Sequence, residues 1–331
     1  MVEVAVGFKN HDNLMEYKEI TQVGAKISRL GFGGCALGGH GWGKSDEDLL
    51  RDSIRKAIDC GVTLFDTADI YGLGKSEKLL GEELQSIRDE VVITTKFGVR
   101  RDNVGTFYDC SSNWISKAVD ASLQRLRTDR IDIYQLHYWD KKTPFEAIQE
   151  CVERLIEKGK VRAFGVTNLK PDFFNQNSTA KPMTFSHELN LVKPEGSSDI
   201  QKTMTKTGAT FLSWGCLAQG ALSGKYTPSH QFGDDDRRSR SVYTAFHGNG
   251  LKRREIVLST MREIIPHYPG KTFSHIALRW ILDELPGSIT LVGIKSPQQI
   301  SMISDAYDWE LDPYHRKCLN QAAMSVPIMS T

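Results

Sequence analysis

The chain has 331 residues, 40% of them hydrophobic and 25% charged, and its 42 lysines and arginines against 41 aspartates and glutamates give a net charge of +1. This composition is globular, and the length suits one large domain or two medium ones. A near-neutral chain lacks the surplus positive charge that holds nucleic acids or anionic membranes. Neither a spanning apolar stretch nor a signal-peptide pattern is present, so we expect a soluble, cytoplasmic protein.

The cysteines lie tens of residues apart, without a CxxC motif or a Cys/His pairing at metal-ligand spacing. We expect reduced thiols in the core and no metal site. The six are Cys35, Cys60, Cys110, Cys151, Cys216 and Cys318.

Short apolar or β-branched runs alternate along the chain with longer helix-period segments, a pattern that favours parallel strands joined by crossover helices. A hairpin is expected over 17–27. The predicted strands that follow are 30–33, 63–66, 91–95, 131–136, 163–166, 183–186, 209–213 and 288–292, and the predicted helices include 46–60, 76–84, 113–126 and 144–158.

Eight such units fit a closed (β/α)8 TIM barrel, which typically takes about 250 residues plus insertions. We expect the barrel domain over 17–321, with an N-terminal tail over 1–16, additional C-terminal helices and a C-terminal tail over 322–331. The alternative, an open doubly wound sheet, would carry a GxGxxG loop after the first strand, and 30–34 (LGFGG) does not provide it. For the long polar stretch 227–250, which contains DDDRR, a solvated surface is favoured over a lid.

Polar residues come directly after several of the predicted strands, where a barrel of this kind builds its active site. Asp66, Lys96 and His137 each stand at a strand end, and Tyr71 follows one short turn after the second strand. Thr167 and Asn168 end the fifth. Because these strand ends meet at one barrel mouth, we expect the side chains to converge there.

Asp66, Tyr71, Lys96 and His137 make chemical sense as a carbonyl-reduction site, since hydride arriving at a carbonyl carbon leaves charge on the oxygen. Tyr71 would donate the proton, and the Lys96 ammonium would lower the pKa of its phenol. Asp66 would be the counter-ion of Lys96, and His137 would orient the substrate oxygen. The absence of an activated Ser or Cys and of paired carboxylates at the strand ends argues against hydrolases and glycosidases.

The stretch 61–72 (GVTLFDTADIYG), with Ser76-Glu77 and Leu80-Gly81 after it, resembles the aldo-keto reductase signature. The segments 94–96 (TTK), 122–137 and 159–168 (GKVRAFGVTN) also resemble this family. The likeness runs from about residue 17 to 321 and is greatest to the bacterial and plant branches near the inositol-locus reductase and the potassium-channel beta subunits. It implies a (β/α)8 fold, bound NADPH, and a catalytic tetrad formed by Asp66, Tyr71, Lys96 and His137.

The resemblance also implies a cofactor site. In the family, residues at matching positions hold the nicotinamide carboxamide, stack on the ring, bind the pyrophosphate and bind the 2′-phosphate. Here they are Thr167, Asn168, Ser186, Trp214, Gly215, Leu217, Gln219, Gly220, Lys225, Gly293, Lys295 and Gln299. Three depart from the usual pattern: Ser186 stands where relatives carry Gln, Trp214 where Tyr or Phe is usual, and Gln219 where relatives often have Arg.

The predicted function is NADPH-dependent reduction of an aldehyde or ketone, sugar-like or from a natural product, in a pocket walled by Trp42, Phe97, Tyr138 and Trp139. A small-molecule carbonyl compound is thus the expected partner. Three alternatives stay open: an NAD(P)-dependent sugar or polyol dehydrogenase that uses the same site, a cofactor-sensing binding subunit like the channel beta proteins, and a barrel isomerase or lyase without nicotinamide. The sequence indicates no oligomeric state.

Overall fold

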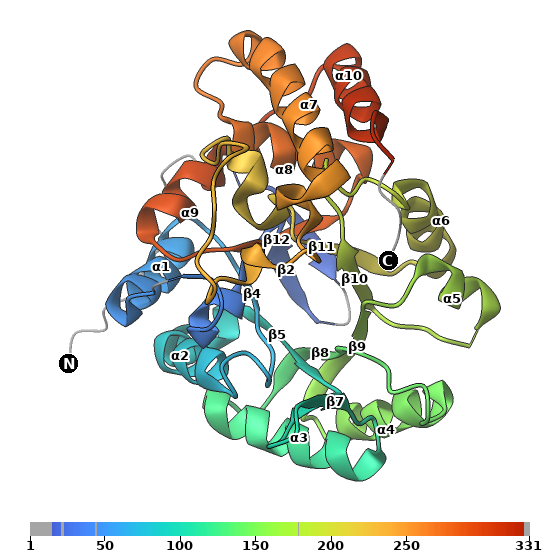
Figure 1. The fold of residues 1–331 in the computed structure, drawn as a ribbon. Coiled ribbons are helices and arrows are strands. Elements are labelled where there is room, and N and C mark those ends of the chain that lie inside the picture. The colour runs from blue at the N-terminus through green and yellow to red at the C-terminus, as the bar shows by residue number, and fades with distance from the viewer. Residues whose placement is uncertain (1–14, 21–22, 44, 178, 328–331) are drawn as a thin grey trace.

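Eight parallel strands close into a barrel in the computed structural model, which describes residues 15–20, 23–43, 45–177 and 179–327. Around the barrel the strands run β10-β11-β12-β3-β4-β5-β8-β9, with β12 paired to β3 so that no edge is left open. The predicted TIM barrel is confirmed, and the open sheet is excluded (Figure 1). Their bounds are β3 (Leu30–Gly33), β4 (Leu64–Asp66), β5 (Val92–Phe97), β8 (Ile131–Leu136), β9 (Val161–Thr167), β10 (Thr184–Glu188), β11 (Thr210–Trp214) and β12 (Ile289–Gly293).

The barrel strands are apolar because both of their faces are covered. One face of each packs against helices in a large core, and the other fills the barrel with a second, smaller cluster that includes Leu64, Val92 and Ile133. The predicted N-terminal hairpin, β1 (Tyr17–Ile20) and β2 (Ala25–Ser28), adds Ile20 and Ile27 to this inner cluster. The hairpin therefore belongs to the barrel's own packing.

Helices surround the strands at the centre of Figure 1. Their starts follow local capping rules: Asp46 and Ser111 accept hydrogen bonds from the first backbone amides of α1 and α3, and Thr272 forms a capping box at α8. The C-terminal helices α7 and α10 pack against each other outside the ring. The bounds are α1 (Glu47–Asp59), α2 (Lys75–Leu84), α3 (Ser112–Leu126), α4 (Phe145–Glu157), α5 (Pro171–Gln176), α6 (Ser197–Thr207), α7 (Gly248–Ile264), α8 (Phe273–Glu284), α9 (Pro297–Ile303) and α10 (Pro313–Met324).

A second hairpin, which the sequence analysis did not predict, follows β5. Its strands β6 (Val99–Arg101) and β7 (Thr106–Tyr108) pair antiparallel across a turn in which the Asp102 amide donates to Gly105 O at 3.0 Å. The Arg100 guanidinium lies 5.0 Å from the Phe107 ring and 4.0 Å from the Trp114 ring. These cation–π contacts attach the hairpin to α3.

The stretch 227–250 is only partly the solvated surface that the sequence favoured. Its beginning is mostly exposed, but Asp236 and Ala245 are buried, and two short 3₁₀ helices form at η4 (Arg237–Ser239) and η5 (Thr244–Phe246). The backbone amide of Arg237 donates to Gly41 O at 3.0 Å, so this segment packs against the loop after β3.

Among the described residues, we find no helix with the length and apolar character needed to cross a membrane.

Candidate active site

The register of the barrel places the predicted strand-end residues on one rim. Asp66 is the last residue of β4 and lies opposite Thr94 of β5, two residues before Lys96. Lys96 Nζ lies 2.8 and 2.7 Å from the two carboxylate oxygens of Asp66 and 2.7 Å from Thr67 O. Both side chains are buried. Three acceptors therefore fix the ammonium in one position.

Tyr71 enters the site from the tight loop between β4 and α2. Its backbone amide donates to Ala68 O at 3.0 Å, and its carbonyl accepts from Ser76 N at 3.2 Å. The loop also packs on Gly38, where a Cβ would lie 2.9 Å from the Tyr71 carbonyl carbon. Lys96 Nζ lies 5.2 Å from the centre of the Tyr71 ring.

His137 follows β8 and completes the set. Its ring meets the Tyr71 ring edge-on, with centroids 5.9 Å apart at 85°. Asn168 Nδ2 donates to its backbone carbonyl at 3.0 Å, and its own Nδ1 is buried with no partner among the described residues. Asp66, Tyr71, Lys96 and His137 thus meet at one place in the barrel mouth.

Burial sets the protonation of this group. Burial lowers the pKa of His137 well below its usual value, and the Lys96 charge adds to the effect, so the imidazole is neutral at pH 7. Burial raises the pKa of Asp66, and the Lys96 ammonium opposes this. Burial also raises the pKa of Tyr71 well above its usual value. The charge of Arg237 opposes this rise. The expected effect of the Lys96 ammonium on the Tyr71 pKa stays a prediction.

Residues predicted for the nicotinamide carboxamide lie beside this group. Thr167 ends β9 and pairs with Ser186 of β10. The backbone amide of Asn168 donates to Ser186 O at 2.9 Å. Ser186 Oγ is buried and has no hydrogen-bond partner in the described part of the chain. Trp214 ends the neighbouring strand β11. The hydroxyl of Ser186 is thus free to bond an incoming amide.

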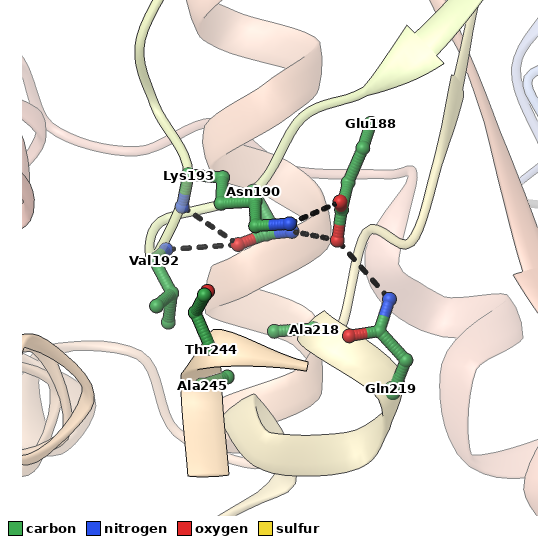
Figure 2. A pocket seen from close by; sticks show the side chains of 8 residues that line it. All are labelled: Glu188, Asn190, Val192, Lys193, Ala218, Gln219, Thr244 and Ala245. Atoms are coloured by element: carbon green, nitrogen blue, oxygen red, sulfur yellow. Dashed lines mark hydrogen bonds and ion pairs between the residues drawn. The ribbon is translucent and has the colours of Figure 1, made fainter. Parts of the chain in front are cut away.

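The loop after β11 contains the short helix η3 (Ala218–Ser223), in which Gln219 and Gly220 adopt left-handed conformations. The Gln219 side-chain amide donates to Glu188 Oε1 at 3.1 Å, and Lys193 Nζ lies 2.7 Å from Glu188 Oε2 (Figure 2). Asn190 Nδ2 donates to Gly215 O at 3.0 Å. Gln219 therefore anchors the loop to Glu188.

A group of positive charges lies between the two predicted phosphate loops. Burial lowers the pKa of Lys295, the charges of Arg238 and Lys225 lower it further, and Asp236 opposes them. Lys295 Nζ donates to Trp42 O at 2.5 Å, and its backbone amide donates to Gln299 Oε1 at 2.7 Å. Three cations with one nearby acid make a positive patch that suits a phosphorylated ligand.

The predicted pocket residues divide into two kinds. Phe97 is wholly buried, with its ring 4.7 Å from that of Tyr134, and Trp139 packs on Phe145 and Phe173. These two rings contribute to the core rather than to an open pocket. The other two, Tyr138 and Trp42, contact aromatic rings of neighbouring loops. Tyr138 is 38% exposed, and its ring stacks on those of Tyr108 and His137. Trp42 meets the Tyr243 ring edge-on, with centroids 5.8 Å apart.

The profile of a known family, described as "Aldo/keto reductase family", matches residues 29–323. The chain belongs to the aldo/keto reductase family. It is therefore an oxidoreductase of a family that uses nicotinamide cofactors.

This aldo/keto reductase is 33% identical to "Aldo-keto reductase YhdN" of Bacillus subtilis (strain 168) over 309 residues, which cover 92% of this chain and 93% of the relative. It is 27% identical to "Aldo-keto reductase yakc [NADP(+)]" of Schizosaccharomyces pombe, with 81% of this chain and 80% of the relative covered. Among solved structures, the glycerol dehydrogenase AKR11B4 from Gluconobacter oxydans is similar with a TM-score of 0.85 and 30% identity, over 95% of this chain and 98% of that one.

Two residues that the sequence analysis did not select for the site also lie at the barrel mouth. Cys35 is the second residue after β3; burial raises its pKa, and the charge of Arg237 opposes this. Its position after a strand end was a usable signal. Arg237 lies over the Trp42 ring at 5.8 Å. It belongs to a charge run that looks like any solvated loop, so the sequence gave no comparable signal.

One buried acid near the site, Asp69, should make the stability of the protein fall as the pH rises. Burial, and then the negative charge of Glu77, raise the pKa of Asp69 to about 8. An unfolded chain releases this proton near pH 4. The folded state therefore binds the proton more tightly, and the contribution present below about pH 4 is lost as the pH rises through about 8.

We expect Asp69→Asn to reduce this loss by up to about 1.4 kcal/mol per pH unit between about pH 4 and 8. Urea unfolding at several pH values measures the slope. Asp129→Asn, which changes a side chain that is 86% exposed, is the matched control and should leave the slope as it is. Equal slopes in wild type and Asp69→Asn would show that Asp69 is ionised in the folded protein.

Proposed function

We propose that this protein is an NADPH-dependent reductase of aldehydes or ketones, in which Tyr71 gives the proton to the substrate oxygen. The observation that carries the proposal is the convergence of Asp66, Tyr71, Lys96 and His137 in one buried group. The four come from three strand ends and one loop, so packing alone does not require a phenol, an ammonium and an imidazole to meet.

When bound, the nicotinamide supplies the hydride. Tyr71 is fully protonated at neutral pH because its pKa is raised, so it holds the proton that the developing alkoxide needs. The Lys96 ammonium beside the ring stabilises the phenolate that forms as this proton leaves. Asp66 and Thr67 O hold the ammonium in place, and neutral His137 is available to hydrogen-bond the substrate oxygen.

Features of this chain support a fit to NADPH. Asn168 and the unpartnered hydroxyl of Ser186 would hold the carboxamide, and the Trp214 indole would stack on the ring. The cations Lys225 and Lys295 would hold the phosphates. A ligand can also approach the backbone at Gly220 and Gly293. A Cβ built at Gly220 would contact only the Tyr226 ring, and a Cβ built at Gly293 would have no neighbour within 4 Å.

The same site in the opposite direction would oxidise a polyol. The observation in favour is the similarity to AKR11B4, which is named a glycerol dehydrogenase. The free state of all six cysteines supports a reducing compartment such as the cytoplasm for either activity.

The test measures dinucleotide binding first and turnover second. Titration followed by NADPH fluorescence should give tight binding, with weaker binding of NADH, and a panel of aldehydes, ketosugars and aromatic ketones should then be reduced. Lys295→Ala should weaken NADPH binding about tenfold or more, the usual cost of losing a charged hydrogen bond. It should weaken NADH binding far less.

Lys252→Ala removes an exposed lysine of α7 and should change neither affinity. Equal losses for both dinucleotides in Lys295→Ala would mean that the 2′-phosphate is bound elsewhere. Failure of either dinucleotide to bind the wild-type protein would overturn the proposed function and favour a barrel isomerase or lyase.

A further inference from the structure

The stem of Arg237 is fixed against the loop that follows β3. The Arg237 amide donates to Gly41 O at 3.0 Å. A Cβ at position 41, where φ is +78°, would overlap the Nε and Cγ atoms of the arginine. Glycine is therefore required at position 41 both for its backbone conformation and for the space that the arginine occupies.

The charged end of Arg237 lies over Trp42, one of the predicted pocket residues. Its guanidinium carbon lies 5.8 Å from the centre of the Trp42 ring, and Trp42 in turn meets Tyr243. Burial raises the pKa of Tyr71, of Cys35 and of Tyr243, and in all three cases the Arg237 charge opposes the rise. Arg237 therefore lies at the part of the mouth formed by Trp42 and Tyr243.

In the described part of the chain, Arg237 makes no ion pair with a carboxylate. The adjacent acid, Asp236, is occupied by Arg238, with contacts of 2.6 and 2.9 Å. Two buried arginines have acidic partners: Arg253 pairs with Glu195 at 2.5 Å and Arg279 with Asp283 at 2.6 Å. The hydrogen-bond partner of Arg237, the Tyr243 hydroxyl, is neutral, and partial burial of a guanidinium without a counter-ion is costly. An anion that arrives with a ligand would offset this cost.

We infer that Arg237 binds a carboxylate carried by the substrate, so that the preferred substrates of this site are oxo acids, meaning aldehydes or ketones with a carboxylate away from the reacting carbonyl. The inference rests on the proposed reductase function and names its substrate class. A guanidinium presents paired donors that match the two oxygens of a carboxylate. Lys225 and Lys295 would hold the dinucleotide phosphates. Arg237 instead lies over Trp42, which the sequence analysis placed in the wall of the substrate pocket.

The test compares 4-formylbenzoate with its methyl ester, two aldehydes that differ mainly in charge. In the wild type, kcat/KM should favour the carboxylate by about tenfold or more, the value of a charged hydrogen bond. Arg237→Gln should bring this preference close to one, mainly by raising KM for the carboxylate, and Arg237→Lys should restore part of it. The NADPH dissociation constant should stay within about twofold in both variants, since the phosphates have other cations.

Arg154→Gln is the control, because Arg154 is an arginine of α4 whose side chain is 54% exposed. It should keep the wild-type preference. Equal use of the two aldehydes by the wild type, or an Arg237→Gln variant that keeps the preference, would overturn the inference while leaving the reductase intact. Weaker NADPH binding in Arg237→Gln with an unchanged preference would assign the arginine to the cofactor instead. If neither aldehyde is reduced and NADPH does not bind, the proposed function itself fails.

Discussion

Tyr71→Phe should lower kcat by about a hundredfold to ten-thousandfold, the usual contribution of a positioned general acid, and should leave NADPH affinity within about twofold. The phenylalanine keeps the ring that lies beside Lys96 and His137 and removes only the hydroxyl. Because the pKa of Tyr71 is raised, the hydroxyl is the donor over the whole neutral range. Single-turnover reduction of an aldehyde, followed by NADPH absorbance, measures the chemical step.

The matched control is Tyr314→Phe, which removes a phenol that is 70% exposed on α10. It should be as active as the wild type. An active Tyr71→Phe variant would exclude the phenol as the proton donor. Tight NADPH binding by a wild-type protein that turns over every carbonyl slowly would favour the cofactor-sensing binding subunit over the reductase.

The barrel was predictable because its strands are covered on both faces. Each of the eight expected strands overlaps a barrel strand of the structure, and the run Ile131–Leu136 matches β8 at both ends. The hairpin of β6 and β7 was missed for the opposite reason. It is short and largely exposed, and it rests on the contacts of Arg100 with Phe107 and Trp114. Contacts between distant residues leave no periodic pattern in the sequence.

The convergence of Asp66, Lys96 and His137 also followed from the sequence, since parallel strands in a barrel end at one rim, and Tyr71 follows β4 by one short loop. The side chains that line the pocket could not be predicted in the same way. Successive residues of a strand point to opposite faces, so when Lys96 points to Asp66, the adjacent Phe97 points away into the outer core. The place of Arg237 depends on the path of a long segment across the mouth, and its neighbour Arg238 in the same charge run pairs with Asp236 instead.

The pairing of Asp66 with Lys96 makes a second strong prediction, in which stability and catalysis respond differently. Lys96→Met and Asp66→Asn each leave one buried group without its partner, so each should destabilise the protein by about 3 kcal/mol or more. Each should also lower kcat by about a hundredfold or more, because the phenolate of Tyr71 loses the ammonium or its fixed position. Urea unfolding and single-turnover kinetics measure the two effects.

The double variant Asp66→Asn with Lys96→Met separates the two roles. No unpaired charge remains in it, so it should be more stable than either single variant, yet its kcat should stay as low as that of Lys96→Met. Asp132→Asn is the control, since Asp132 forms another buried ion pair, 2.6 Å from Arg88, among residues that do not belong to the candidate tetrad. It should destabilise the fold and keep kcat. If the double variant is destabilised by the sum of the losses in the two single variants, the two side chains do not act as a pair. Recovery of kcat in it would mean that the ammonium is not needed beside Tyr71, since the variant keeps the phenol and removes the positive charge next to it.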